Sequence, residues 1–136
     1  MQQTQSEIKI LDAKAATGVG NTILCSDFRH LDLVIATDGM GAGDTITVKI
    51  QGSSSLEAPA FGSAKTIDNE WDYIQTVDKE DGSTDDGDAG ISFADADDLR
   101  KLTINVDGLS YFTVNVITIS DTTNTSVSAR ATLYND

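Results

Sequence analysis

Apolar and polar residues alternate along several short stretches of this chain, and this two-residue period is the feature that most constrains its fold. In residues 44–50 (DTITVKI), the Ile and Val side chains fall on one side of an extended strand and the Thr and Lys side chains on the other. The same alternation recurs in residues 100–108 and 126–134. A shift of one residue would put every apolar side chain of such a strand in water, so the pattern predicts half-buried β-strands.

Six further segments have the residue types of strands but a less regular alternation. In residues 110–119, Ile117 and Ile119 fall out of phase with the apolar residues before them, which indicates a β-bulge or a second buried face. Together with the three regular strands, the segments predict eight or nine short strands. They are residues 6–13, 21–25, 30–37, 71–78, 90–94 and 110–119.

Clusters of Gly, Asp, Asn and Ser separate these segments, as turns require. The strongest turn signal is Asp107-Gly108, which predicts a tight two-residue hairpin between neighbouring strands. Residues 93–101 (FADADDLRK) have room for one helical turn at most, with Asp95 or Asp97 as its N-cap.

The fold class that follows is all-β, a two-sheet antiparallel β-sandwich. A jelly roll of about eight strands is favoured, and an immunoglobulin-like sandwich is the alternative. Residues 17–136 are expected to form the sandwich domain. Residues 1–16 form either an edge strand or an arm that adds a strand to a neighbouring molecule.

The charge of the chain excludes two classes of partner. The formal net charge is −13, and the nine Lys and Arg residues are scattered. Binding to nucleic acid or to an anionic membrane surface needs clustered basic residues, so neither partner is expected.

No arrangement of residues typical of catalysis is present, and we expect a non-enzymatic protein. His30 is the one histidine, and it alternates outward beside Asp32, as a surface residue would. Cys25 is the one cysteine and lies among apolar residues, which indicates an inert buried thiol and no intrachain disulfide. Neither glycine-rich stretch leads into a helix that could hold phosphate.

Residues 79–90 (KEDGSTDDGDAG) are the one candidate for a metal site, because five of the twelve are Asp or Glu. Calcium binds several carboxylate oxygens, but the EF-hand pattern fails with Gly82, Gly87 or Gly90 at its sixth position. The candidates for a nonstandard Ca²⁺ site are Asp85, Asp86 and Asp88. The favoured interpretation is a solvated acidic loop and no cofactor.

The order of strands and Gly/Asp turns resembles small accessory virion proteins of tailed bacteriophages. The resemblance covers about residues 20–135 and lies in DTITVKIQGSSS, NEWDYIQTVD, DGDAGISFADADDLRKLTINVDGLSYFTVNV and SVSARATLYN. It implies a jelly roll on the head, as a decoration or cement protein or the base of a head fibre, often a homotrimer. The implied partner is the major capsid protein or another virion protein, and no catalytic residues are implied.

A place on the capsid exterior agrees with the net charge, since DNA would repel such a chain. The N-terminus has no visible signal peptide, so synthesis in the host cytoplasm is expected. Docking would need a neutral or apolar patch. The candidates for it are Ile8, Ile10, Leu11, Ile117 and Ile119.

Two alternatives remain open at this point, a tail or fibre component and a carbohydrate- or surface-binding β-sandwich module. The second would need exposed aromatic rings on which sugars stack. Trp71 is more consistent with a buried core residue than with such a platform.

Overall fold

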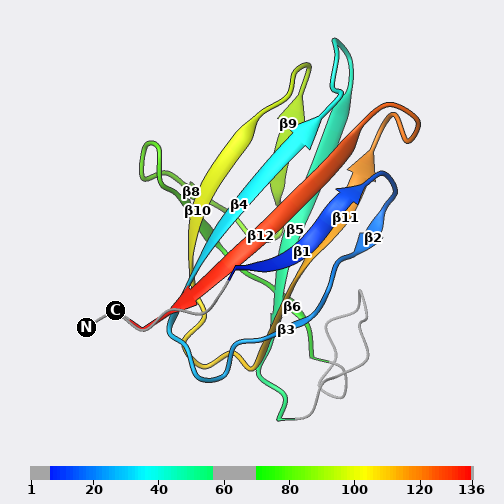
Figure 1. Cartoon of the computed structure of the whole chain (residues 1–136). Coiled ribbons are helices and arrows are strands. Elements are labelled where there is room, and N and C mark those ends of the chain that lie inside the picture. Colours follow the sequence, from blue (N-terminus) through cyan, green and yellow to red (C-terminus); the bar gives the residue numbers. More distant parts are fainter. Residues whose placement is uncertain (1–6, 57–69, 136) are drawn as a thin grey trace.

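Every regular element in the computed structural model is a β-strand (Figure 1), and the model describes residues 7–56 and 70–135. The number of strands exceeds the predicted eight or nine because five of them are only two or three residues long. The strands are β1 (Ile8–Lys14), β2 (Gly18–Val19), β3 (Ile23–Leu24), β4 (His30–Asp38), β5 (Thr45–Ser53), β6 (Asp72–Tyr73), β7 (Thr76–Asp78), β8 (Thr84–Asp85), β9 (Ile91–Ala94), β10 (Leu99–Asn105), β11 (Tyr111–Ile119) and β12 (Ser126–Tyr134).

The strands form two antiparallel sheets packed face to face. Sheet A has the order β1-β12-β4-β10-β7-β8. Sheet B has the order β2-β11-β5-β6, with β3 also on β11 and β9 also on β5. Eight strands pair from the outside of the chain inwards, as β1 with β12, β2 with β11, β4 with β10 and β5 with β9. This nested hairpin, rolled over two sheets, is the connectivity of a jelly roll. The predicted sandwich is confirmed, in its jelly-roll form.

The core lies between the sheets and consists of the inward residue of each alternating pair. Ile46, Val48 and Ile50 of β5 are at most 2% exposed, as their period predicted. The inward residues of β12 are buried in the same way. Trp71 is also buried, so the predicted core position is confirmed and this ring offers no stacking platform.

Two local predictions were wrong because the chain changes sheets where a local pattern suggested continuity. Residues 71–78 divide into β6, paired with β5 in sheet B, and β7, paired with β10 in sheet A. Asp107-Gly108 does form a turn, closed by a hydrogen bond from the Leu109 N–H to the Val106 carbonyl. That turn joins β10 in sheet A to β11 in sheet B, so it makes a corner between the sheets and not a hairpin.

Residues 93–101, which had room for one helical turn at most, form no helical turn. Asp95 has a left-handed backbone, with φ of 71°. Its carboxylate accepts a hydrogen bond from the Gly43 N–H at 2.9 Å, and that of Asp97 accepts one from the Met40 N–H at 2.8 Å. The two carboxylates therefore hold the β4–β5 loop at one end of the sandwich.

The apolar residues of β11 fall out of phase because the strand contains a β-bulge, one of the two predicted causes. Its register with β5 shifts between Val116 and Thr118, which leaves Ile117 as the extra residue of a bulge. Ile117 is exposed, whereas Ile119 packs against the core.

Cys25 is fully buried, and burial raises the pKa of its thiol to about 11. At pH 8 only about one thiol in a thousand is then ionised, so we expect a disulfide reagent to label native protein far more slowly than protein in guanidinium chloride. The folded-state pKa of Cys25 lies above the ordinary value of 9.0, so ionisation of the thiol favours the unfolded chain. The free energy of unfolding therefore keeps its full value below pH 9 and decreases as the pH rises through 11.

That loss amounts to about 2–3 kcal/mol. Urea denaturation at pH 8 and at pH 11 should therefore show a smaller loss of stability in Cys25→Ala than in the parent. Rapid labelling of the native protein at pH 8 would contradict the buried thiol.

Candidate functional site: the outer face of sheet A

The outer face of sheet A is built by the outward residues of four neighbouring strands. The alternation turns every second residue of β4, β10 and β12 away from the core, and the pairing register places these residues side by side in rows. Lys9 of β1 lies beside Arg130 and extends the second row. From the top of the sheet, the rows are Ser128, Ala36 and Leu99; Arg130, Val34 and Lys101; Thr132, Asp32 and Thr103; and Tyr134, His30 and Asn105.

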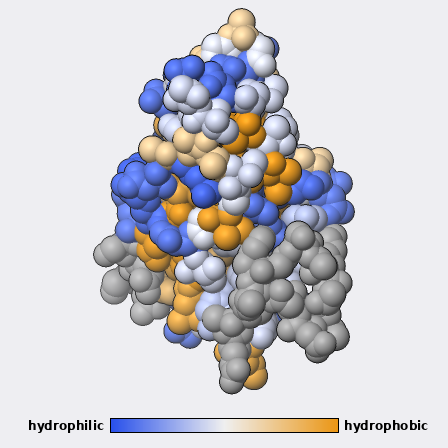
Figure 2. Space-filling model, turned by 90° about the vertical axis from the view of Figure 1, so that its right-hand side faces the viewer, coloured by the Kyte–Doolittle hydropathy of each residue, from blue (hydrophilic) through white to orange (hydrophobic). Residues whose placement is uncertain are grey.

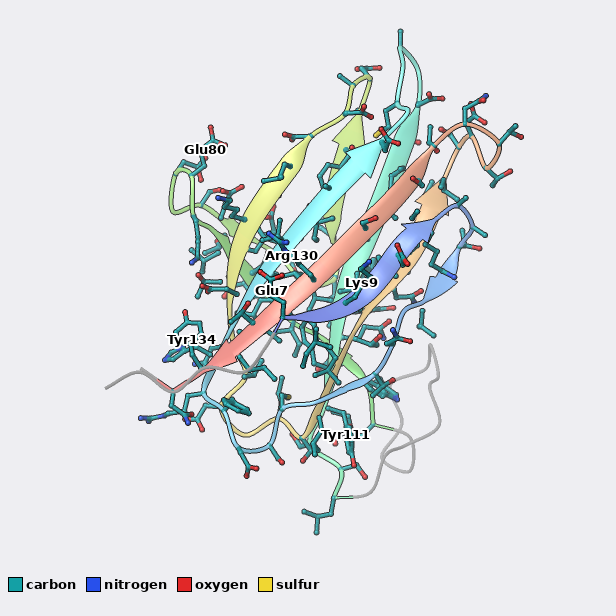
Figure 3. All side chains as sticks on the ribbon, viewed as in Figure 1. Glu7, Lys9, Glu80, Tyr111, Arg130 and Tyr134 are labelled. Carbon is teal, nitrogen blue, oxygen red and sulfur yellow. The ribbon has the colours of Figure 1, made fainter. Side chains whose placement is uncertain are left out.

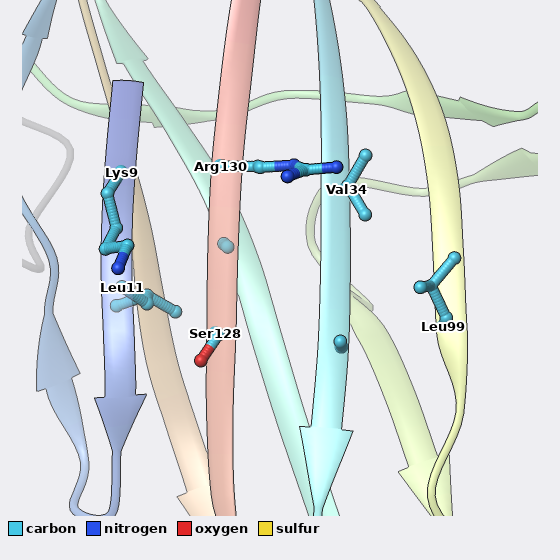
Figure 4. Close-up of a pocket in the computed structure, with 8 residues that line it drawn as sticks. Lys9, Leu11, Val34, Leu99, Ser128 and Arg130 are labelled. Carbon is cyan, nitrogen blue, oxygen red and sulfur yellow. The ribbon is translucent and has the colours of Figure 1, made fainter. Parts of the chain in front are cut away.

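A hollow of about 310 Å³ lies in the first two rows (Figure 4). Its floor is low because Ala36 and Ser128 carry small side chains at the centre. Lys9 stands at one side and Leu99 at the other, and Arg130 extends from β12 across β4 toward Val34 (Figure 4). Leu99 is 53% exposed, although it is a large apolar residue.

Two further hollows join the first. One of about 250 Å³ shares Val34 and Arg130 with it, and one of about 210 Å³ shares Leu99 with it. The second and third hollows share Lys79 and Lys101. Together they form one trough across β1, β12, β4, β10 and the start of the β7–β8 turn, which we call the sheet A trough.

The sheet A trough is nearly neutral, although the chain carries −13. Its lining contains five cationic and four anionic residues, a net charge of +1. The acidic excess of the chain therefore lies elsewhere. The cationic residues are Lys9, Lys79, Arg100, Lys101 and Arg130, and the anionic ones are Glu7, Asp32, Asp78 and Glu80.

Several of these charges are already paired within the chain. Arg130 contacts Glu7 at 3.3 Å, and the two side chains lie together over sheet A (Figure 3). The Nζ atom of Lys9 lies 3.5 Å from Oδ1 of Asp12. A surface whose charges are largely paired with one another attracts a strongly acidic or basic partner only weakly.

Asp32 is the centre of the polar end of this face. Its two carboxylate oxygens accept hydrogen bonds from Lys79 Nζ at 2.7 Å, from Tyr134 Oη at 2.9 Å and from Thr103 Oγ1 at 3.3 Å. His30 stacks on Tyr134 with 5.4 Å between the ring centres. Burial raises the pKa of Tyr134, and its hydrogen bond to Asp32 acts in the same direction. Tyr134 therefore stays a hydrogen-bond donor near neutral pH and holds the C-terminal end of β12 against β4.

The calcium candidates are not gathered into a ligand set. Asp85 lies in β8 and pairs with Thr76, whereas the Asp86 carboxylate accepts a hydrogen bond from the Asp88 N–H at 2.9 Å. In residues 7–56 and 70–135, no group of three or more His, Cys, Asp or Glu side chains is placed to hold a metal ion. Part of the presumed loop is thus the short strand β8. Hydrogen bonds from Ser83 lower the pKa of Asp81 in the preceding turn.

The five interface candidates do not form one exposed patch. Ile10 and Leu11 are each only 2% exposed, because a bulge in the β1–β12 pairing turns both toward the core. Of the five, only Ile117 is an exposed residue. Ile10 and Leu11 are thus largely covered in the single chain, although Leu11 also lines the first hollow of the sheet A trough. The remainder of the proposed arm, residues 1–6, lies outside the described residues.

The strand β1 pairs with β12 along its inner edge, and its outer edge is partly covered. The Ile10 carbonyl accepts a hydrogen bond from the Asn21 N–H at 3.0 Å, and the Lys9 carbonyl accepts one from Asn21 Nδ2 at 3.1 Å. On the side of the molecule that carries β1 and β2, apolar residues are interspersed with polar ones (Figure 2). Addition of a foreign strand to β1 would have to displace Asn21.

Sequence reasoning missed the sheet A trough. One signal for it was present, since Leu99 lies out of phase with the inward residues Leu102 and Ile104 of the same segment. The hollow itself depends on Ala36 and Ser128 standing side by side, and these residues come from segments more than ninety positions apart.

Comparisons with known proteins give a likeness of fold. No protein-family model and no curated protein sequence matches the chain. The SPBc2 prophage-derived protein YomS has a similar solved structure, with a TM-score of 0.68 and 10% identity over 99% of this chain and 96% of that one. The PBSX exported protein XepA matches with a TM-score of 0.64 and 14% identity over 98% of this chain. The match spans only 38% of XepA, so the same fold is one part of a longer protein there.

The structural neighbours are thus prophage-encoded proteins, and they share the all-β sandwich. In the described part of the chain, no helix is long and apolar enough to span a membrane.

Proposed function

We propose that this chain is a non-enzymatic structural protein of a phage, placed on the outside of the virion as a decoration or auxiliary head protein. The observation that carries the proposal is the end-to-end match to YomS, a prophage-derived protein with the same single sandwich. The resemblance to accessory virion proteins points in the same direction. The net charge of −13 supports an external position, because packaged DNA would repel the chain.

In this role the protein acts by binding and not by chemistry. Its partner is the major capsid protein or another virion protein. A protein that binds only the assembled shell stabilises that shell by mass action, and binding at a hundred times Kd contributes about 2.7 kcal/mol per site.

The experiment is co-purification with particles of the phage or prophage that encodes the chain. We expect the chain to band with particles in a caesium chloride gradient, at a fixed number of copies per capsid by quantitative mass spectrometry. Tagged protein added to particles that lack the chain should restore the same number. Absence from particles, together with no rebinding, would rule out the virion role. Separate analysis of heads and tails distinguishes a head protein from a tail or fibre component.

A second candidate is a binding module of an exported protein, and one observation favours it. The matching part of XepA is 38% of a protein described as exported. This function predicts that the chain stays in the soluble fraction of the gradient and binds intact host cells or isolated cell-wall polysaccharide in a pull-down. The particle experiment therefore separates the two candidates directly.

A further inference from the structure

We propose that the sheet A trough is an interface between two copies of this chain, related by a two-fold axis so that the same face meets itself. The inference is independent of the proposed function, since it concerns the pure protein. It rests on the shape of the trough, its exposed aliphatic side chains and its charge.

The shape of the trough contains both a projection and a recess. Leu99 projects at the rim, and the recess over Ala36 and Ser128 lies directly beside it in the same row. A cavity of roughly 150 Å³ in a protein core already holds benzene, so a hollow of about 310 Å³ admits an aliphatic side chain. Two copies facing each other can therefore each place Leu99 into the recess of the other. A two-fold interface requires this self-complementarity.

The outer face of sheet A carries two exposed aliphatic residues. Only five large apolar residues of the described chain are exposed, and two of them, Leu99 and Val77, lie on sheet A. Val77 pairs with Thr103, so its side chain stands in the same outward row as Asp32. Covering both in a pair would remove apolar area that a monomer leaves in water.

The charge of the trough favours a second copy over a charged partner. The net charge of the lining is +1, and both signs are present. Two such faces do not repel, and Lys101 of one copy can approach an acidic side chain such as Glu80 of the other. A strongly acidic partner would instead gain little, because Arg130, Lys9 and Lys79 already contact Glu7, Asp12 and Asp32.

The size of the face is sufficient for a weak pair. The strands β1, β12, β4 and β10 are seven to nine residues long. With β7 beside them and about 4.8 Å between strands, they cover roughly 20 Å by 25 Å, or about 500 Å² per copy. The total of about 1,000 Å² is in the range of weak, transient interfaces, so we expect a dissociation constant in the micromolar range.

Sedimentation equilibrium of the full chain, from about 1 to 500 μM, tests the interface. We expect a monomer–dimer equilibrium that strengthens as NaCl rises from 20 to 500 mM, because salt screens the repulsion between two chains of −13. Leu99→Glu should weaken dimerisation at least tenfold, and Lys101→Glu should weaken it several-fold. Both positions are exposed, so the melting temperature of each variant should match that of the parent.

Leu24→Glu is the matched control, because Leu24 is 58% exposed but lies on sheet B. It should leave the dissociation constant within about twofold of the parent value. If Leu99→Glu fails to fold, Lys101→Glu alone decides. A monomer under all conditions, a trimer, or a dimer that both trough variants leave unchanged would overturn the proposal.

Discussion

Phe112→Ala is expected to lower the free energy of unfolding by about 3–5 kcal/mol, which is a large part of the stability of a domain this size. Phe112 is the second residue of β11 and is fully buried between the two sheets. Truncation removes its buried apolar area and leaves a cavity, because the ladders to β5 and β3 hold the backbone on both sides. Urea denaturation followed by circular dichroism measures the loss.

Leu24→Ala is the control from the same strand pair. Phe112 pairs with Ile23 and Tyr111 with Leu24, but the Leu24 side chain points away from the core and is 58% exposed. Its truncation should change the free energy of unfolding by less than about 0.5 kcal/mol. Equal losses in the two variants would show that β11 does not bury Phe112 in the way described.

Gly39→Ala is expected to cost about 3 kcal/mol, from two causes that act together. Gly39 directly follows β4 and has φ of 77°, a conformation that costs a residue with a Cβ about 1–2 kcal/mol. A Cβ at this position would also collide with the carbonyl oxygen of Asn124 in the β11–β12 loop. The two loops would have to separate at the end of the sandwich. Thermal and urea denaturation measure the cost.

Gly43→Ala separates the two causes. Gly43 has φ of 86° in the same β4–β5 loop, and nothing lies within 4 Å of the position its Cβ would take. It should therefore show the conformational cost alone, about 1 kcal/mol. If both variants lose the same stability, the close approach of Asn124 to Gly39 contributes nothing.

Much of the candidate site could not be predicted from the sequence, although many of its residues could be placed on a strand. The alternation in residues 30–37 and 126–134 correctly placed His30, Asp32 and Arg130 outward. It could not show that Asp32 meets Tyr134 and Lys79, because those contacts depend on the pairing of three strands and on the β7–β8 turn. The sequence also could not show the bulge in the β1–β12 pairing, which leaves Ile10 and Leu11 each only 2% exposed.

In residues 79–90, too, the turns could be predicted from the sequence and the strand pairing could not. Their Gly and Asp content correctly predicted turns, and Gly82 and Gly90 both have φ of 75°. A local pattern could not show that Thr84–Asp85 would pair with β7 and extend sheet A.

By itself, the sequence determined the strands, the faces they bury and the positions of the turns. These features depend on near neighbours along the chain, namely side-chain period, turn chemistry and the cost of exposing an apolar set. Only the tertiary structure decided which strands pair. Asp107-Gly108 bends the chain as its residues require, but the Ser110 N–H then bonds the Ser53 carbonyl at 2.7 Å, and β11 joins β5 in the opposite sheet. The free energy that selects this partner comes from apolar surface buried between segments far apart in the chain, which no local pattern contains.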